Sequence, residues 1–202
     1  MLNNNEYLNR LYQSDKPLII YKTDKGFDVY TDFSKKFLIN KKNIKTFLNS
    51  QTKKKHSNSK SLNCYVGFFG YKLLCENIGI KLPKQKTNNF YTGLFYQPLT
   101  KVSIRKKISI QSIRPDFRNI KINKKNYELL DKKFNLNLTL QQYSKLFKNF
   151  SKNIKQGKTY QIKIAQNYSK KGTINPIDLF WKLMRMNESP ESFLIRDKNF
   201  NI

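Results

Sequence analysis

The sequence predicts a mixed α/β (α+β) fold in which antiparallel β-sheets pack against helices. Three observations predict it. Apolar and polar residues alternate in several short segments, apolar residues recur at three- and four-residue steps in two longer segments, and there are enough of them to build a core. Of the 202 residues, 38% are hydrophobic and 14% are aromatic. This length fits one large domain or a domain and a half.

Residues 159–168 show the clearest alternation. Tyr160, Ile162 and Ile164 fall on one face of a two-residue period, and Gln161 and the other intervening residues fall on the opposite face. This is the pattern of a strand that buries one side. We therefore predict a strand over residues 159–168.

A helix is predicted from Pro176 to about Met186. Asn175 is a good N-cap, and proline suits the first helical position because the N–H that it lacks would be unpaired there. One apolar stripe should face a core while Lys182 and Arg185 face water. The stripe consists of Ile177, Phe180, Trp181 and Met184. Beyond the helix, residues 193–195 predict a strand, 196–199 a tight turn and 200–202 the opening of a second strand.

A second helix is predicted to begin at Leu140 and to end before Gly157, a plausible C-cap residue. Its apolar side chains lie on one helical face: Tyr143, Leu146, Phe147, Phe150 and Ile154.

Further strands are predicted towards the N-terminus. Residues 65–71 predict an apolar strand that passes into a short helix, with glycines where side chains would block a close backbone approach. Residues 90–96 predict a strand that Pro98 ends, and residues 102–113 predict another around Arg105. Residues 41–60, rich in lysine, read as a hydrated loop.

Two of these stretches, in this order, resemble the component I family of chorismate-using enzymes, anthranilate synthase and aminodeoxychorismate synthase. The first is Tyr65-Val-Gly-Phe-Phe-Gly-Tyr71, although Lys72 stands where many members carry Asp or Glu. The second is Gly157-Lys-Thr-Tyr-Gln-Ile-Lys-Ile-Ala-Gln166, followed by a helix and Asn187-Glu-Ser-Pro190. In the family these segments form a strand, a helix and a turn that leads into further strands.

The resemblance implies an N-terminal domain over residues 1–135 and the start of a chorismate-binding domain over residues 140–202, with the boundary near 135–139. In the family, the Ser-Pro-Glu segment, the glutamates that hold Mg²⁺ and a histidine that handles protons all come after the strand at residues 200–202. We therefore expect this chain to be the front part of a longer protein. No catalytic or metal-binding residue is assigned within it.

In function, the resemblance implies a full-length protein that converts chorismate and ammonia from glutamine into anthranilate and pyruvate. Mg²⁺ would be the cofactor and a glutamine amidotransferase subunit the partner. The Asn-x-Ser-Pro turn and residues 197–200 favour anthranilate synthase. Tyr160-Gln161 with Ala165-Gln166 favours the alternative, aminodeoxychorismate synthase of the 4-aminobenzoate and folate branch.

The resemblance also implies an effector site. In anthranilate synthases an Asn-Pro-Ser-Pro-Tyr-Met turn lines a feedback pocket for tryptophan, together with a Leu-Leu-Glu-Ser segment from the N-terminal strands. Asn187, Ser189 and Pro190 match the turn, whereas Glu188 departs from it. No Leu-Leu-Glu-Ser counterpart is found near residues 18–21. The simpler interpretation of residues 187–190 is a turn that ends the preceding helix.

The charge of the chain suggests a competing class of function. Lys and Arg number 40 against 13 Asp and Glu, which gives a net charge of +27. A non-catalytic nucleic-acid-binding module would have this charge. However, the lysines are spread along the chain, and no zinc-finger spacing, helix-turn-helix signal or ribonucleoprotein-type aromatic motif is found. Nucleic acid is therefore not the expected partner.

The remaining composition points to a cytoplasmic protein. There is no apolar run long enough to span a membrane and no signal-peptide pattern, so we expect no membrane contact. Cys64 and Cys75 do not form a Cys-x-x-Cys pair and should be reduced packing residues. His56 is the sole histidine and lies in the lysine-rich segment. A histidine-based metal site or a Ser-His-Asp triad is therefore not expected.

Overall fold

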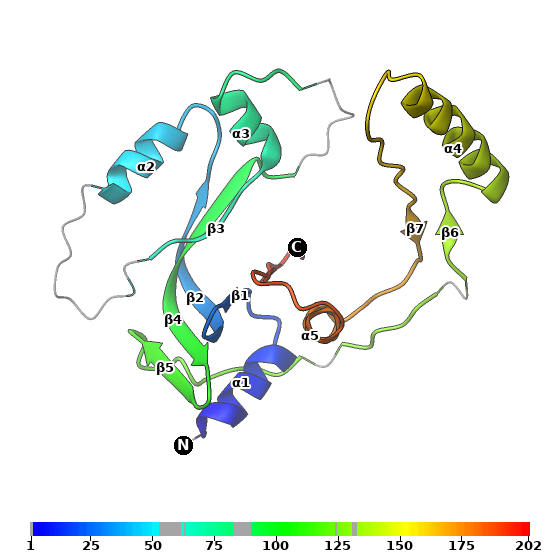
Figure 1. The fold of residues 1–202 in the computed structure, drawn as a ribbon. Helices are drawn as coiled ribbons and strands as arrows, with labels where there is room; N and C mark the ends of the chain where they lie inside the picture. Colours follow the sequence, from blue (N-terminus) through cyan, green and yellow to red (C-terminus); the bar gives the residue numbers. More distant parts are fainter. Residues whose placement is uncertain (1, 53–61, 63, 83–89, 124, 131–132) are drawn as a thin grey trace. The chain divides into compact units, whose positions relative to one another are not determined.

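The computed structural model describes residues 2–52, 62, 64–82, 90–123, 125–130 and 133–202 (Figure 1). They form two compact units. One comprises Met1–Lys124 with Pro176–Ile202, and the other comprises Lys125–Asn175. These units are defined by contacts within the chain. The family domains inferred from the resemblance, 1–135 and 140–202, stay a prediction.

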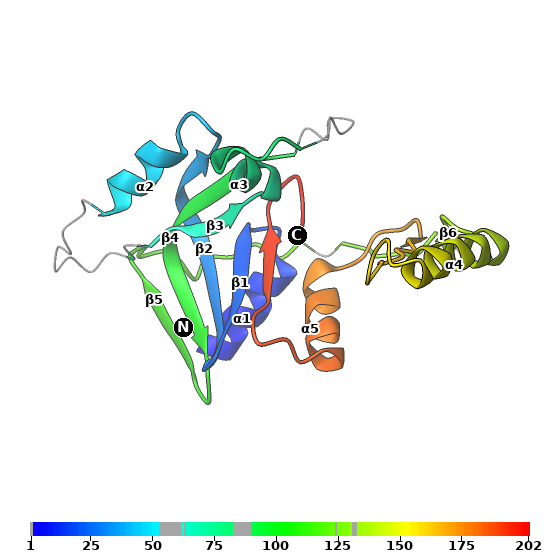
Figure 2. The same cartoon turned by 45° about the horizontal axis from the view of Figure 1, so that its top comes forward.

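The first unit is built on one antiparallel sheet, which bears out the predicted α+β class (Figures 1 and 2). The strand order is β3-β4-β2-β1-β8, and β5 also pairs with β4. β8 therefore joins the sheet beside β1, although the two strands lie at opposite ends of the sequence. The elements of this unit are α1 (Asn4–Gln13), β1 (Leu18–Thr23), β2 (Gly26–Leu38), α2 (Ile44–Thr52), β3 (Val66–Phe69), α3 (Tyr71–Asn77), β4 (Gly93–Ile104), β5 (Ile108–Ser112), α5 (Pro176–Met186) and β8 (Phe193–Arg196).

The main core lies between α1, α5 and one face of the sheet. The predicted stripe of α5 is confirmed, because Ile177 and Phe180 are buried while Trp181 and Met184 pack against the same cluster. The ring centroid of Trp181 lies 4.7 Å from that of Phe27 on β2. The core side chains of the other elements include Tyr7, Leu11, Leu18, Ile20, Val29, Val102 and Leu194.

A smaller core lies where α2 and α3 pack against the ends of β2, β3 and β4. Ile39, Ile44 and Leu73 are buried there, and Phe47 of α2 contacts aromatic side chains of the sheet. The predicted loop at 41–60 is therefore wrong for residues 44–52. The apolar residues Ile44 and Phe47, one helical turn apart, bury against the sheet. Residues 53–61, with His56, lie outside the described residues.

The predicted strand with packing glycines is confirmed as β3, followed by α3. A β-carbon built on Gly67 would lie 2.0 Å from the carbonyl oxygen of Leu94 on β4, and one on Gly70 would lie 2.7 Å from that of Thr92. Both distances are far shorter than any real contact. Glycine is required at these two positions because the backbones approach closely.

The strands predicted at 90–96 and 102–113 are wrong in their bounds. β4 runs through Pro98 to Ile104, and residues 105–107 form a hairpin turn rather than the middle of a strand. Pro98 is opposite Phe33, next to a register shift in β2. It also lies between the part of β4 that pairs with β3 and the part that pairs with β5. At such an irregularity the missing N–H of proline costs little.

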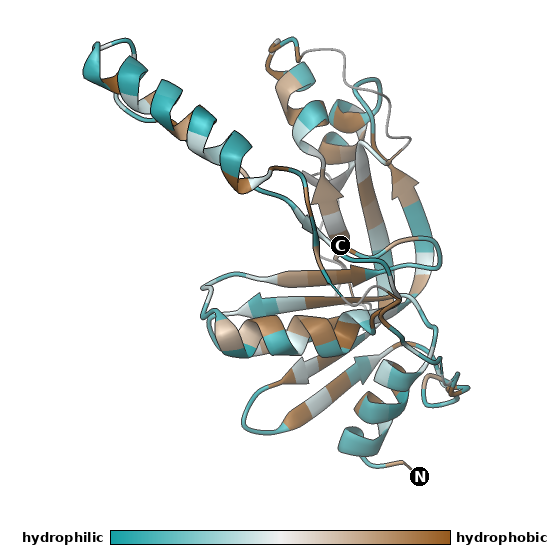
Figure 3. Cartoon of the chain, turned by 90° about the vertical axis from the view of Figure 1, so that its right-hand side faces the viewer, coloured by the Kyte–Doolittle hydropathy of each residue, from teal (hydrophilic) through white to brown (hydrophobic). Residues whose placement is uncertain are grey.

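The second unit contains β6 (Asn135–Leu136), α4 (Leu140–Lys155) and β7 (Tyr168–Ser169). The predicted helix is confirmed, with a capping box between Thr139 and Gln142. Gly157 follows the helix with φ +69° and donates its N–H to the carbonyl of Ile154. No residue of α4 is buried, and Figure 3 shows polar and apolar residues alternating along it.

The strand predicted over 159–168 is wrong for most of its length. Only Tyr168 and Ser169 are in a ladder, with residues 135–136, and the side chain of Tyr160 is 92% exposed. A strand is stable only when a neighbouring strand takes up its backbone N–H and C=O groups. Among the described residues, 159–166 have no such neighbour, so the alternating side chains are not buried.

Composition predicted two further features: cysteines that pack in the interior, and no helix that spans a membrane. Both cysteines are free; Cys75 is buried, as expected for a packing residue, whereas Cys64 is partly exposed. Within the described ranges, no helix is both long and apolar enough to cross a membrane.

Candidate functional site

The segment after α5 lies against the end of β1. β8 pairs antiparallel with β1, so that Tyr21 is opposite Phe193. One residue further along β1, the N–H of Lys22 donates to the carbonyl of Ser192 at 2.7 Å. The Nζ of Lys22 donates to the carbonyl oxygen of Ser189. The turn formed by residues 187–192 is thereby held at the end of β1 through backbone and side chain together.

A surface depression lies at this contact. It is lined from β1 and its hairpin turn by Tyr21, Lys22, Thr23 and Asp24, and from the other side by Pro190 and Glu191. The predicted effector residues occupy different places in this arrangement. Pro190 lines the depression and Ser189 offers its carbonyl, whereas the N–H of Asn187 bonds to Leu183 and closes the last turn of α5. Ligand binding by Asn187, Ser189 and Pro190 stays a prediction.

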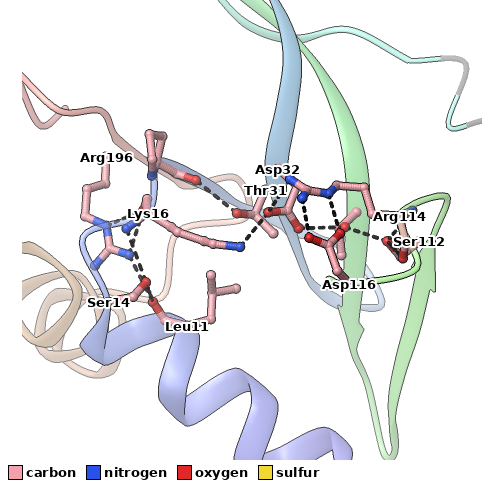
Figure 4. Close-up of polar contacts among 11 residues, drawn as sticks. Leu11, Ser14, Lys16, Thr31, Asp32, Ser112, Arg114, Asp116 and Arg196 are labelled. Atoms are coloured by element: carbon pink, nitrogen blue, oxygen red, sulfur yellow. Dashed lines mark hydrogen bonds and ion pairs between the residues drawn. The ribbon is translucent and has the colours of Figure 1, made fainter. Parts of the chain in front are cut away.

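Arg196, at the end of β8, fixes the strand to the end of α1 (Figure 4). Its guanidinium donates to the carbonyl of Leu11 at 3.0 Å, of Tyr12 at 3.1 Å, and of Lys16 at 2.9 Å. The carbonyls of Leu11 and Tyr12 belong to the last turn of α1, where a cation also interacts favourably with the helix dipole. Arg196 thus links the C-terminal strand to the N-terminal helix.

A buried carboxylate lies next to this link, also shown in Figure 4. Asp32 accepts hydrogen bonds from Lys16 at 2.7 Å and from the hydroxyl of Thr100 at 2.8 Å. Arg114 approaches it to 4.0 Å. Asp32 has φ +54°, a conformation that Asp tolerates better than most residues, and it lies just before the register shift of β2 between Phe33 and Lys35. Since these neighbours donate to the carboxylate and offset its charge, Asp32 can be buried at this position of the sheet.

A third polar cluster holds the turn that follows β8. Asp197 accepts hydrogen bonds from the Nζ of Lys36 at 2.6 Å and from the hydroxyl of Tyr96 at 2.6 Å. Lys36 also lies over the rings of Tyr91 and Phe200. Burial by itself raises the pKa of Asp197, but the hydrogen bonds from Lys36 and Tyr96 outweigh it and hold this pKa below its ordinary value.

This shift predicts a loss of stability in acid. A carboxyl group with a lowered pKa in the folded state stabilises the protein above its unfolded pKa, and the contribution disappears as the pH falls from about 4 towards the folded pKa. Asp197→Asn should therefore cost stability at pH 7 but lose less between pH 5 and pH 3 than the wild type. Urea unfolding at each pH measures both effects. Asp24→Asn, at an exposed carboxylate, is the control, and equal acid sensitivity of all three proteins would contradict the assignment.

A family model described as chorismate binding enzyme matches residues 9–202, which is nearly the whole chain. The chain belongs to the chorismate-binding enzyme family. Membership supports a chorismate-utilising enzyme with chorismate as the small-molecule substrate. No curated protein matches the sequence closely enough to count as a relative.

The resemblance to the component I enzymes implies Mg²⁺ as a cofactor. Mg²⁺ is bound by carboxylates in near-octahedral geometry. Within the described ranges, no group of three or more His, Cys, Asp or Glu residues lies together. The buried carboxylates Asp28 and Asp32 are each paired with basic side chains instead. These residues do not fit a magnesium site.

Sequence reasoning missed Lys22 as a residue of the depression. Lys22 lies about 170 positions before the turn that it contacts, and only the pairing of β1 with β8 brings the two together. One observation could have predicted the position of Lys22: in anthranilate synthases, a segment of the N-terminal strands lies beside this turn. The prediction found no counterpart of that strand near residues 18–21 because the Leu-Leu-Glu-Ser side chains are not present there.

Proposed function

We propose that this chorismate-binding chain is component I of anthranilate synthase. In its full-length form the protein would convert chorismate and ammonia, supplied from glutamine, into anthranilate, pyruvate and water. The observation that carries the proposal is the family match over residues 9–202 together with the Asn187-Glu-Ser-Pro190 turn, which lies at the end of an N-terminal strand. A strand beside this turn is the arrangement that the resemblance to anthranilate synthases implies.

The proposal includes an effector role for that turn. Asn187, Ser189 and Pro190 would help to bind an aromatic amino acid such as tryptophan, with Tyr21 on the opposite wall of the depression. It also includes Mg²⁺ as the cofactor of the full-length protein, a glutamine amidotransferase subunit as its partner and the cytoplasm as its location. The ion would be held by residues outside the described ones.

Aminodeoxychorismate synthase is the second candidate within the family. Tyr160-Gln161 with Ala165-Gln166 favours it, and it uses the same two substrates without eliminating pyruvate. Growth complementation separates the two reactions. The gene encoding this protein should restore growth of a tryptophan auxotroph that lacks component I. Rescue of a 4-aminobenzoate auxotroph alone would establish the second reaction, and rescue of neither strain would argue against both.

The 202-residue chain by itself should not form anthranilate from chorismate, ammonium and Mg²⁺. The reason is that the family's glutamates and proton-handling histidine are absent from the segments that resemble it. Anthranilate fluorescence measures the product directly, with a complete anthranilate synthase as the positive control. Turnover by the purified chain above the uncatalysed rate would show that the chemistry resides within these residues.

A nucleic-acid-binding module remains the alternative from another class. The observation that favours it is a row of exposed lysines on α4, spaced by three or four residues: Lys145, Lys148, Lys152 and Lys155. Electrostatic binding to phosphates weakens steeply as salt rises. If nucleic acid were the partner, sub-micromolar affinity should persist at physiological salt. If binding disappears at physiological salt, the lysines attract nucleic acid only non-specifically, and nucleic acid is not the partner.

A further inference from the structure

Lys22 lines the depression and makes a side-chain contact with the turn at residues 187–192. The resemblance to the component I family does not imply this contact. The side chain of Lys22 is half-buried, and its Nζ donates to the carbonyl oxygen of Ser189, just beyond the end of α5. Its backbone N–H bonds to Ser192 in the same turn. The backbone bond forms whatever side chain stands at position 22. The ammonium contact depends on the lysine side chain, and it joins Lys22, which lines the depression, to the residue before Pro190, which also lines it.

The acceptor that Lys22 occupies is suited to an ammonium group. A backbone carbonyl oxygen accepts a hydrogen bond from an ammonium group, and the carbonyl of Ser189 directly precedes Pro190, which lines the depression. The walls on either side, Tyr21 and Pro190, offer apolar surface to an aromatic ligand. An aromatic amine in the depression would therefore direct its ammonium group to the Ser189 carbonyl. Lys22 already makes that hydrogen bond within the chain.

We propose that Lys22 competes, from within the chain, with the ammonium group of any amine ligand at this depression. A ligand must displace the lysine before its own ammonium group can reach the Ser189 carbonyl. Effector binding is consequently weakened by this chain's own side chain. The inference rests on the proposed effector role of residues 187–190 and concerns its regulation.

The test uses the 202-residue chain, Lys22→Met and a matched control, Lys25→Met, at an exposed lysine of the same hairpin. Each protein is titrated calorimetrically with L-tryptophan, with tryptamine, which lacks the carboxylate, and with indole-3-propionate, which lacks the ammonium group. A hydrogen bond to a charged group corresponds to roughly a tenfold change in affinity. Lys22→Met should therefore bind tryptophan and tryptamine about tenfold more tightly than the wild type. Lys25→Met should match the wild type, and indole-3-propionate should gain nothing from either variant.

Three outcomes would overturn the proposal. Unchanged affinities in Lys22→Met would show that the lysine does not compete. Weaker binding of tryptophan and indole-3-propionate would show that Lys22 holds a ligand carboxylate instead. Absence of binding to every protein at millimolar ligand would show that the depression takes no such amine. The growth complementation test is independent of these results, so loss of this inference leaves the proposed enzymatic function intact.

A measurement on the wild type keeps the proposal testable if Lys22→Met does not fold. The hydrogen-bonded ammonium group of Lys22 should give a slowly exchanging ¹⁵Nζ signal in NMR spectra. Saturation with tryptamine should release the ammonium group into water and remove that signal, while exposed lysines stay unaffected. Persistence of the signal at saturation would mean that ligand and lysine do not share one acceptor.

Discussion

Gly67→Ala should lower the free energy of unfolding by about 3 kcal/mol, because an added β-carbon has no room in the β3–β4 pairing. That carbon would lie 2.0 Å from the Leu94 carbonyl oxygen and 2.7 Å from the Cα of Phe95. Both atoms belong to the backbone of β4, so no side-chain rotation can relieve the overlap. The strands must separate, which also loosens the core beneath α3. Urea denaturation followed by far-UV circular dichroism measures the loss.

Gly79→Asn is the matched control for this substitution. Gly79 has φ +83° and no neighbouring atom within 4 Å of its built β-carbon. Asparagine tolerates positive φ, so this variant should lose less than about 1 kcal/mol. If both glycine variants lost the same amount, the cause would be backbone entropy rather than the close approach of β3 to β4.

Arg196→Ala should also cost about 3 kcal/mol, through the loss of its hydrogen bonds to three carbonyl groups. These carbonyls lie at and just beyond the end of α1, where alanine leaves them without a charged donor. Since the guanidinium is the link between β8 and α1, the C-terminal strand should loosen first. Trp181 is the only tryptophan and packs in the same core, so its fluorescence reports this loss in a denaturant titration.

Two variants delimit the role of Arg196. Arg196→Lys keeps the charge but not the planar fork of donors, so its stability should fall between those of the wild type and the alanine variant. Arg185→Ala removes an exposed arginine of α5 and should change stability by less than about 0.5 kcal/mol. A full recovery by lysine would show that charge near the α1 terminus matters and that the geometry of the donors does not.

Local chemistry was sufficient for several elements of this protein. The helix at Pro176–Met186 and its buried stripe, the capped helix at Leu140–Lys155 and the glycine-containing β3 were all predicted correctly. Each depends on neighbours within one or two turns, or on glycine positions with an immediate steric meaning. The two motifs also led to the chorismate-binding family, because they are short, ordered segments read directly from the sequence.

Long-range pairing decided what the sequence alone did not. Residues 159–166 have the alternation of a strand but no neighbouring strand among the described residues, so periodicity alone gave the wrong answer there. β4 can pass through Pro98 for two reasons. On one side of β4, Pro98 lies between the residues that pair with β3 and those that pair with β5. On the other side it is opposite Phe33 of β2, next to the register shift. Neither fact is encoded near the proline itself.

The candidate site shows the same division. The sequence by itself determined the turn at Asn187–Pro190, since a helix stop and a proline are local signals. Only the tertiary structure placed β8 beside β1, and with it the ammonium group of Lys22 against the Ser189 carbonyl. The physical reason is that strand order depends on the burial of whole sheet faces, a property of all the strands together that no single segment contains.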